Sequence, residues 1–393
     1  MSARREQPMV EGAGFLLVLN AGSSSLKFAL FDCARQPLTR EPAWKGALQG
    51  IGSAGSRQAA LRHVRERAAD FLQGRRMVAV AHRVVHGGSK YFEATLLDDA
   101  VLADLKSCIP LAPLHQPFAL EAIEALRQGQ PDLPQVACFD TGFHHTLPLV
   151  EQLLPLPWGA WQRGLRRYGF HGLSYQYQSV ALAERHGDRA RGRVIVAHLG
   201  SGASLCALHE LRSVATTMGF SALDGLMMGT RTGALDPGVL LYLMDNEQLT
   251  LEQVTQLLYH ESGLLGISGI SPEPRVLLQH EGDAGEAGER ARLALALYVR
   301  RIVREIGSLT AALGGLDMLV FTAGVGEHSA VIRERVCAGL AWLGVKLDAA
   351  ANLQNRPLIS GRSSRVQVAV EPANEEWIAA TQAVRRLAAA FSS

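Results

Sequence analysis

The sequence has few cysteines, and their spacing does not suit any common use of them. The five cysteines among 393 residues are scattered and never spaced as Cys-x-x-Cys, which argues against a disulfide framework and against a zinc ribbon. Long apolar runs are also missing, since clean stretches such as residues 293–299 fall far short of the about 20 residues that cross a bilayer. We therefore expect neither a disulfide scaffold nor a membrane partner.

An excess of one charge sign is missing as well. The 39 Lys and Arg residues nearly balance the 37 Asp and Glu residues, and the net charge of +2 gives no field that favours nucleic acid. Hydrophobic residues make up 48% of the chain, which excludes disorder and suffices for large cores. No apolar segment follows Arg4 and Arg5, so we expect no secretory signal and a cytoplasmic location.

Glycine, in contrast, is abundant: its 39 residues are about a tenth of the chain, against a usual ~7%. Residues 20–25 (Asn-Ala-Gly-Ser-Ser-Ser) lie between predicted strands at 15–19 and 26–32. Residues 200–204 (Gly-Ser-Gly-Ala-Ser) lie in the same way between predicted strands at 193–199 and 205–208. This repeat, nearly half the chain apart, suggests two related α/β domains.

Strands alternate with helices along the rest of the chain, which favours mostly parallel α/β sheets. We predict two domains, one of residues 1–145 plus the C-terminal helix at 377–393, and one of residues 146–376 that binds nucleotide and carries a dimer interface. The further predicted elements are helices at 61–72, 98–106, 117–127, 286–313 and 329–343 and strands at 78–85, 135–139, 317–321 and 365–370.

Three glycine-bearing turns follow predicted buried strands: the two above and residues 322–327 (Thr-Ala-Gly-Val-Gly-Glu). Backbone N–H groups approach a phosphate closely only where side chains are absent, and serine hydroxyls add donors. Lys27 follows the first turn and would add positive charge. Any one of these turns alone is better explained as an ordinary tight turn, but the three together favour phosphate binding.

Arginine or histidine stands beside glycine in three further blocks, at residues 82–88, 168–172 and 228–233. A guanidinium offers a planar fork to phosphate or carboxylate oxygens, and an imidazole donates a hydrogen bond without a fixed charge. Asp140 ends one predicted strand, and Glu375 and Glu376 follow the last one. These carboxylates suit Mg²⁺, although a strand-terminal Asp that caps a turn is an equally good reading of Asp140.

Taken in order, these blocks closely resemble the acetate kinase family, from about residue 15 to residue 384. The resemblance implies the fold shared by actin, hexokinase and heat-shock ATPases, with two duplicated actin-like (ribonuclease H-like) ATPase domains around a nucleotide cleft, in a homodimer. The matching blocks are residues 20–28, 82–88, 139–141, 167–172, 198–200, 228–231, 261–266, 321–327 and 374–376.

The resemblance implies direct, reversible transfer of the γ-phosphoryl group of ATP to acetate, which gives acetyl phosphate and ADP and depends on Mg²⁺, with Mn²⁺ as a substitute. The residues fit this chemistry independently. A carboxylate acceptor is already ionised at pH 7 and needs no general base. Two anions must approach each other, so the site needs cations and positioning above all.

The resemblance also assigns roles to individual residues. The catalytic residues would be Asp140, Arg83, His171, Arg231 and His115. Metal binding would fall to Asn20, Glu375 and Asp140. Acetate would lie among Arg83, Val85, Leu114, Phe170 and Ala222. ATP and its phosphates would contact Lys27, Ser23, Ser25, His198, Leu199, Gly200, Ser201, Gly202, Arg275, Gly324, Val325, Gly326 and His328.

Several positions depart from the family pattern. Ser201 and His328 each stand where an asparagine is usual, and Glu273-Pro274 alters the stretch before Arg275. Ala222 stands where a proline often lies beside the substrate methyl group. A smaller side chain there would admit propionate, since one extra methylene is worth only about 0.8 kcal/mol.

Two other functions compete with this one. A nucleotide-binding regulatory or assembly protein of the actin-like fold would bind ATP with no dependence on acetate or on Arg83. Arg83 and Arg231 beside His171 argue against it, because an ATP sensor has no use for a carboxylate pocket. The second alternative, an NAD-dependent dehydrogenase, is suggested only by the two glycines of residues 324–326. The third glycine of the dinucleotide-binding motif Gly-x-Gly-x-x-Gly is missing there.

Overall fold

The computed structural model describes residues 14–22, 25–51, 54–113 and 115–391. By compactness the chain divides into two units. Unit 1 comprises Met1–Phe143, Gly172–Tyr177 and Asn374–Ser393, and unit 2 comprises His144–His171 and Gln178–Ala373. Residues 172–177, which the sequence analysis assigned to the second domain, thus group with unit 1, where Gly172 N donates to Asp140 O (2.8 Å).

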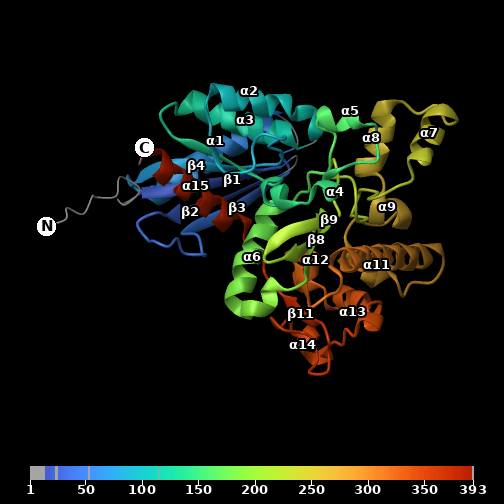
Figure 1. Ribbon diagram of the computed structural model, residues 1–393. Helices are drawn as coiled ribbons and strands as arrows, with labels where there is room; N and C mark the ends of the chain where they lie inside the picture. The colour runs from blue at the N-terminus through green and yellow to red at the C-terminus, as the bar shows by residue number, and fades with distance from the viewer. Residues whose placement is uncertain (1–13, 23–24, 52–53, 114, 392–393) are drawn as a thin grey trace. The chain divides into compact units, whose positions relative to one another are not determined.

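Unit 1 is built on a six-stranded sheet in the order β3-β2-β1-β4-β6-β5 (Figure 1). β1 pairs antiparallel with β2 and parallel with β4, and β4 pairs parallel with β6. The strands are β1 (Gly14–Ala21), β2 (Ser25–Asp32), β3 (Trp44–Gln49), β4 (Arg76–Val84), β5 (Thr95–Leu96) and β6 (Gln135–Phe139). The helices are α1 (Ala54–Leu72), α2 (Asp99–Ser107), α3 (Gln116–Gly129) and α15 (Glu375–Phe391), with a 3-10 turn at Ile109–Leu111.

Unit 2 is built on a five-stranded sheet in the order β11-β10-β7-β8-β9. Its strands are β7 (Val194–Leu199), β8 (Ala203–His209), β9 (Arg212–Thr216), β10 (Met318–Thr322) and β11 (Gln367–Val370). β7, β8 and β9 form an antiparallel meander, β10 runs parallel to β7, and β11 runs parallel to β10. This topology repeats the arrangement of β1, β2, β3, β4 and β6, so the predicted duplication into two actin-like halves is confirmed.

The remaining helices belong mostly to unit 2 (Figure 1). The helix α11 (Glu286–Leu313) buries the stripe of Leu295, Ile302, Ile306 and Leu309, and it ends at Gly314 in the left-handed region. The others are α4 (Leu149–Gln152), α5 (Trp158–Gln162), α6 (Gly172–His186), α7 (Pro237–Asp245), α8 (Leu251–His260), α9 (Gly263–Ser268), α10 (Pro274–His280), α12 (Ala323–His328), α13 (Ala330–Ala338) and α14 (Ala349–Leu353), with 3-10 turns at Gly142–Thr146, Gly187–Arg191 and Ala341–Leu343.

Two sequence predictions differ from the structure near the third glycine turn. Residues 322–327 were expected to form a loop, but Ala323–His328 is the short helix α12. The helix expected at 329–343 ends at Ala338, and a separate 3-10 turn follows at Ala341–Leu343. The structure also contains strands β3, β5 and β9 and the helices between residues 149 and 280, none of which the periodicity predicted.

All five cysteines are buried free thiols. Burial raises their pKa values, to about 11 for Cys33 and to about 12 for Cys206 and Cys337. Over the described part of the chain, none of the helices combines the length and the apolar character needed to cross a bilayer.

Candidate active site

In unit 1, three parallel strands bring polar side chains to one edge of the sheet. Asn20 lies near the end of β1, Arg83 lies on β4 opposite Cys138 of β6, and Asp140 follows β6 directly. The carboxyl ends of parallel strands meet at the same edge, where ligands of α/β folds bind. Three predicted site residues therefore come together because of strand direction.

Arg83 is the centre of this group. Its Nη1 donates to Asn20 Oδ1 (3.0 Å), its Nε donates to both carboxylate oxygens of Asp140 (3.0 and 2.9 Å), and Nη2 pairs with Asp140 Oδ2. Glu375 Oε2, at the start of α15, lies 3.9 Å from Arg83 Nε. The guanidinium thus holds the oxygens of Asn20, Asp140 and Glu375 around one point.

The electrostatics of this group combine burial with strong pairing. Burial by itself lowers the pKa of Arg83, but the charges of Asp140 and Glu375 outweigh it and raise that pKa above its ordinary value. Burial raises the pKa of Glu375, and the neighbouring Glu376 adds to the rise while Arg83 opposes it. Arg83 therefore stays a cation throughout the physiological range.

The donor set of this group fits Mg²⁺. Its ligand atoms are carboxylate and amide oxygens, which a hard cation prefers, and Mg²⁺ usually takes one or two carboxylates plus substrate phosphates. Among the described residues, no cluster of three or more His, Cys, Asp or Glu side chains would hold an ion by itself. A metal at Asn20, Asp140 and Glu375 would therefore need phosphate oxygens to complete its shell.

In unit 2, a second group of polar side chains surrounds the turn between β7 and β8. His171 precedes α6 with φ at 58°, an uncommon conformation for a residue other than glycine. Its Nδ1 is hydrogen-bonded to Ser204 Oγ of β8 (2.8 Å), and its ring stacks on His198 with 4.2 Å between centroids. Glycine has no β-carbon, but one placed at Gly202 would lie 3.1 Å from His171 Nε2 and 3.7 Å from Arg231 Nη1.

Gly202 therefore marks a point that the imidazole and the guanidinium both approach. Arg231 Nη1 also donates to the carbonyl of Ala222 (3.0 Å), which fixes the arginine next to another predicted substrate residue. A side chain at position 202 would press on His171 Nε2, so glycine keeps this point clear for close approach. The arrangement brings a guanidinium and an imidazole nitrogen to one point, a chemistry that suits a small anion.

The helix α12 carries the third glycine turn and is held from two sides. Glu327 accepts hydrogen bonds from the backbone N–H groups of Ala323 (2.8 Å) and Ala373 (3.0 Å). Arg333, which is fully buried, donates to the carbonyls of Gly326 and Glu327 (2.9 Å each). A Cβ built on Gly324, in contrast, would meet no atom within 4 Å, so this part of the backbone is open to a ligand.

The other predicted residues lie as follows. His115 precedes α3, and Val85 and Phe170 are buried. Arg275 lies on α10, mostly exposed and 3.7 Å from Glu273. Ser23 and Leu114 lie outside the described residues. The other residues predicted to contact ATP lie at strand ends, in the β7–β8 turn or on α12: Lys27 and Ser25 on β2, His198 and Leu199 on β7, Gly200 and Ser201 in the turn, and Val325 and His328 on α12.

Sequence reasoning missed three residues that support this site. Ser204 orients His171, and Glu327 and Arg333 fix α12. Ser204 and Glu327 belong to the glycine turns already singled out, so their position in the motif was a usable signal. Arg333 carries no comparable signal, because an arginine in a predicted helix reads as a solvated side chain.

The duplicated topology, the glycine turns and the position that His171 and Arg231 both approach are those of a kinase of the actin-like ATPase fold. The chain belongs to the acetokinase family, whose model matches residues 56–381. An acetate kinase of Rhodopseudomonas palustris (strain ATCC BAA-98 / CGA009) is 48% identical over 392 residues, covering 93% of this chain and 96% of the relative. An acetate kinase of Rickettsia akari is 42% identical over 388 residues, covering 95% and 99%.

Solved structures agree with this assignment. The acetate kinase of Porphyromonas gingivalis matches with a TM-score of 0.82 at 35% identity, covering 95% of this chain and 100% of that one. A propionate kinase of Francisella tularensis matches with a TM-score of 0.84 at 34% identity, covering 94% and 98%. Both carry the same fold over nearly their whole length.

Proposed function

We propose that this protein transfers the γ-phosphoryl group of ATP to acetate, giving acetyl phosphate and ADP, and that it also catalyses the reverse reaction. The observation that carries the proposal is the point beside Gly202, where His171 Nε2 and Arg231 Nη1 both approach one position. Family membership and the acetate kinase names of the relatives support the choice of acceptor.

The chemistry needs charge compensation more than proton transfer. An acetate oxygen attacks the γ-phosphorus in line, the bond to the ADP oxygen breaks, and ADP leaves with that electron pair, so no phosphoenzyme forms. Arg83 and Arg231 offset the repulsion between the two anions. His171 Nδ1 and Ser204 Oγ share a hydrogen bond. In the proposed mechanism Ser204 is the donor, so Nε2 carries the proton and donates to a transferring phosphoryl oxygen.

The nucleotide phosphates would lie on the backbone of Gly200, Ser201 and Gly202, with Gly324 and Val325 toward the adenosine. Asn20, Asp140 and Glu375 would hold Mg²⁺, which supplies positive charge at the phosphate oxygens when it is bound. Lys27, the register partner of Asn20 across β1 and β2, would add a further cation there.

A hydroxamate assay with ATP, Mg²⁺ and acetate tests this function. We expect acyl phosphate to form, and we expect Arg83→Ala to abolish it. No acyl phosphate with acetate, propionate or butyrate would falsify the proposal. ATP binding that is indifferent to acetate and to Arg83→Ala would instead favour a regulatory or assembly protein of the same fold.

We also propose propionate as a second substrate. Ala222 has a smaller side chain than proline, and its carbonyl accepts a hydrogen bond from Arg231, which is proposed to act on the acceptor. The likeness to a propionate kinase supports the idea. The test is kcat/KM for both acids in the wild type and in Ala222→Val, which should shift the ratio toward acetate. Propionate turnover at background in the wild type would reject it.

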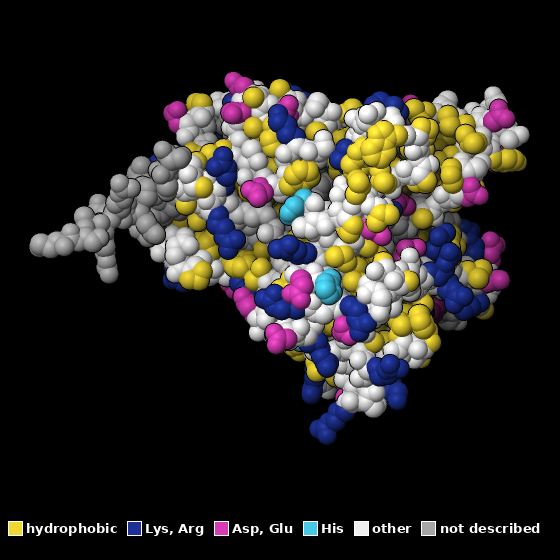
Figure 2. Space-filling view, in the orientation of Figure 1, with side chains coloured by type: hydrophobic (Ala, Val, Ile, Leu, Met, Phe, Trp, Pro, Cys, Tyr) yellow, Lys and Arg dark blue, Asp and Glu magenta, His cyan; other side chains and the backbone are white. Residues whose placement is uncertain are grey.

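We further propose that the protein is a cytoplasmic homodimer. Hydrophobic side chains gather on α7 and α8 (Figure 2), including Leu241 (69% exposed), Tyr242 (56%) and Leu251 (71%). A contiguous apolar face of this kind marks an interaction surface, and five free, buried thiols suit a reducing compartment. Light scattering should give twice the chain mass for the wild type and the chain mass for Leu241→Glu, while Leu293→Glu on α11 stays dimeric.

A further inference from the structure

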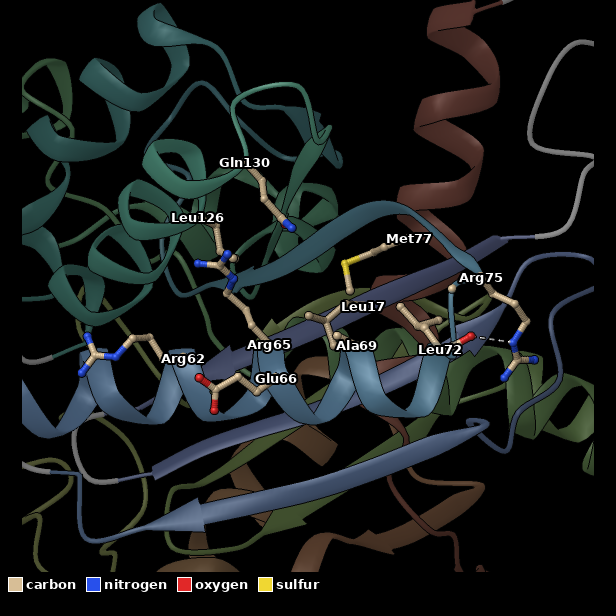
Figure 3. Close-up of a pocket in the computed structure, with 11 residues that line it drawn as sticks. Leu17, Arg62, Arg65, Glu66, Ala69, Leu72, Arg75, Met77, Leu126 and Gln130 are labelled. Atoms are coloured by element: carbon tan, nitrogen blue, oxygen red, sulfur yellow. Dashed lines mark hydrogen bonds between the residues drawn. The ribbon is translucent and has the colours of Figure 1, made fainter.

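Unit 1 contains a hollow of about 540 Å³, and none of the predicted site residues that the structure describes lines it. Its floor is aliphatic, formed by Leu17 of β1, Leu72 of α1, Met77 of β4 and Leu126 of α3 (Figure 3). A volume of this size falls within the range of small-molecule sites. The hollow therefore has room for an apolar body of several carbons.

One face of α1 forms the wall of this hollow. Arg62, Arg65, Ala69 and Leu72 recur at the three- and four-residue spacing that places side chains on one side of a helix. Ala69 is exposed in the middle of this stripe, and its small side chain leaves the hollow open. A larger residue at position 69 would fill it.

The charges on the wall are mostly positive. Arg65 is half-buried and extends from α1 toward Leu126 and Gln130 (Figure 3). Within the described part of the chain, no group forms a hydrogen bond or an ion pair with its guanidinium. Arg65 Nη1 lies close to α3: a β-carbon placed at Gly129, which has none, would be only 2.9 Å from it. A half-buried cation above an aliphatic floor lacks full hydration and is stabilised by an anionic ligand.

Two further arginines and a single acid complete the rim. Arg75 Nε donates to Leu72 O (3.1 Å), and its guanidinium lies 4.6 Å from the ring centroid of Phe15, so it is held in place but not neutralised. Arg62 and Arg75 lie at opposite ends of the hollow in Figure 3. Among the described residues that line it, Glu66 is the one acid, so the three guanidiniums outnumber the carboxylate there.

We propose that this hollow binds an anionic amphiphile, a molecule with a carboxylate or phosphate head and a short alkyl body. The head pairs with Arg65, and Arg62 and Arg75 add long-range attraction. The body covers the apolar surface that Met77 and Ala69 expose, which adds to the binding free energy. The neighbouring hollow, which shares Met77 and Gln130, extends the space along β4.

Isothermal titration of the full-length protein with octanoate, octyl phosphate and octyltrimethylammonium tests the proposal. The two anions should bind at least tenfold more tightly than the cation, and the tighter anion identifies the head group. Arg65→Gln should weaken anion binding at least tenfold, and Ala69→Leu should abolish it. Arg67→Gln, the same change on the exposed opposite side of α1, should leave it unchanged.

Three outcomes would overturn the proposal. One is no binding of either anion at millimolar concentration. Another is an equal loss of affinity in Arg65→Gln and Arg67→Gln. The third is complete displacement of octanoate by saturating acetate, which would assign the binding to the predicted acetate site. None of these outcomes depends on the kinase activity, so the proposed function stands or fails separately.

Discussion

Replacing Ser204 by alanine removes the hydroxyl that is hydrogen-bonded to Nδ1 of His171 at 2.8 Å. Ser204 is fully buried on β8, so no water takes the place of its hydroxyl without rearrangement. A neutral hydrogen bond contributes about 1 kcal/mol, and we expect kcat to fall roughly fivefold to tenfold because the imidazole loses its orientation. KM for acetate should change little, since Ser204 holds His171 and not the acceptor.

The chain offers a matched control for this experiment. Ser213 is equally buried, and its Oγ is bonded at 2.8 Å to Nδ1 of another histidine, His144. Both Ser→Ala variants remove a buried hydroxyl that is hydrogen-bonded to a histidine Nδ1, which costs roughly 1–3 kcal/mol of unfolding free energy. Coupled-enzyme kinetics and urea denaturation of the pair should show similar destabilisation but a loss of kcat only in Ser204→Ala. Full turnover in Ser204→Ala, or an equal loss in Ser213→Ala, would refute the orienting role.

Three further changes probe other parts of the molecule. Arg231→Ala should lower kcat by several orders of magnitude with an unchanged circular dichroism spectrum, and near-normal turnover would remove Arg231 from the mechanism. Glu327→Ala should raise KM for ATP about tenfold, because α12 loses both backbone contacts of that carboxylate; an unchanged KM would contradict its role. Burial lowers the pKa of His144 from 6.5 to about 4, so the unfolded chain takes up the proton first and stability falls as the pH drops below about 6.5. The share of this loss that comes from His144 should be about 2 kcal/mol at pH 5, with the buried His82 and His86 adding to the total. Urea denaturation at pH 7 and pH 5 should show a smaller loss of unfolding free energy in His144→Gln than in the wild type, and an unchanged loss in the exposed His145→Gln.

Many of the strands and helices could be predicted from apolar runs and helical periodicity in the sequence. The strand at 135–139 and the helix at 286–313 begin and end where predicted, because each buries a continuous run or a regular stripe. Short elements such as α7 to α10 were missed, since a helix of six to ten residues gives too few turns to establish a period. The helix α12 was missed for a different reason: its two glycines favour a loop, and the buried Arg333 that donates to the carbonyls of Gly326 and Glu327 lies outside the motif.

The site was predictable where it depends on strand ends. Arg83 and Asp140 meet because both lie at the carboxyl ends of adjacent parallel strands, a relation that residue order alone suggests. The contact between His171 and Ser204 joins the start of α6 to β8, and no local pattern encodes it. The Arg65 hollow was equally hidden, because it depends on an exposed alanine and on the path of α3 beside α1.

The burial of all five thiols makes the cysteines of the native protein unreactive toward electrophiles. A thiolate, not a thiol, attacks electrophiles, and thiols with pKa values near 11 or 12 supply almost none at neutral pH. Alkylating reagents should therefore leave the folded enzyme untouched, and modification will report only molecules that have opened. The rate at which each cysteine is alkylated, followed by mass spectrometry, thus measures how often the surrounding structure opens. Cys33 and Cys138 report on unit 1, and Cys206 and Cys337 report on unit 2.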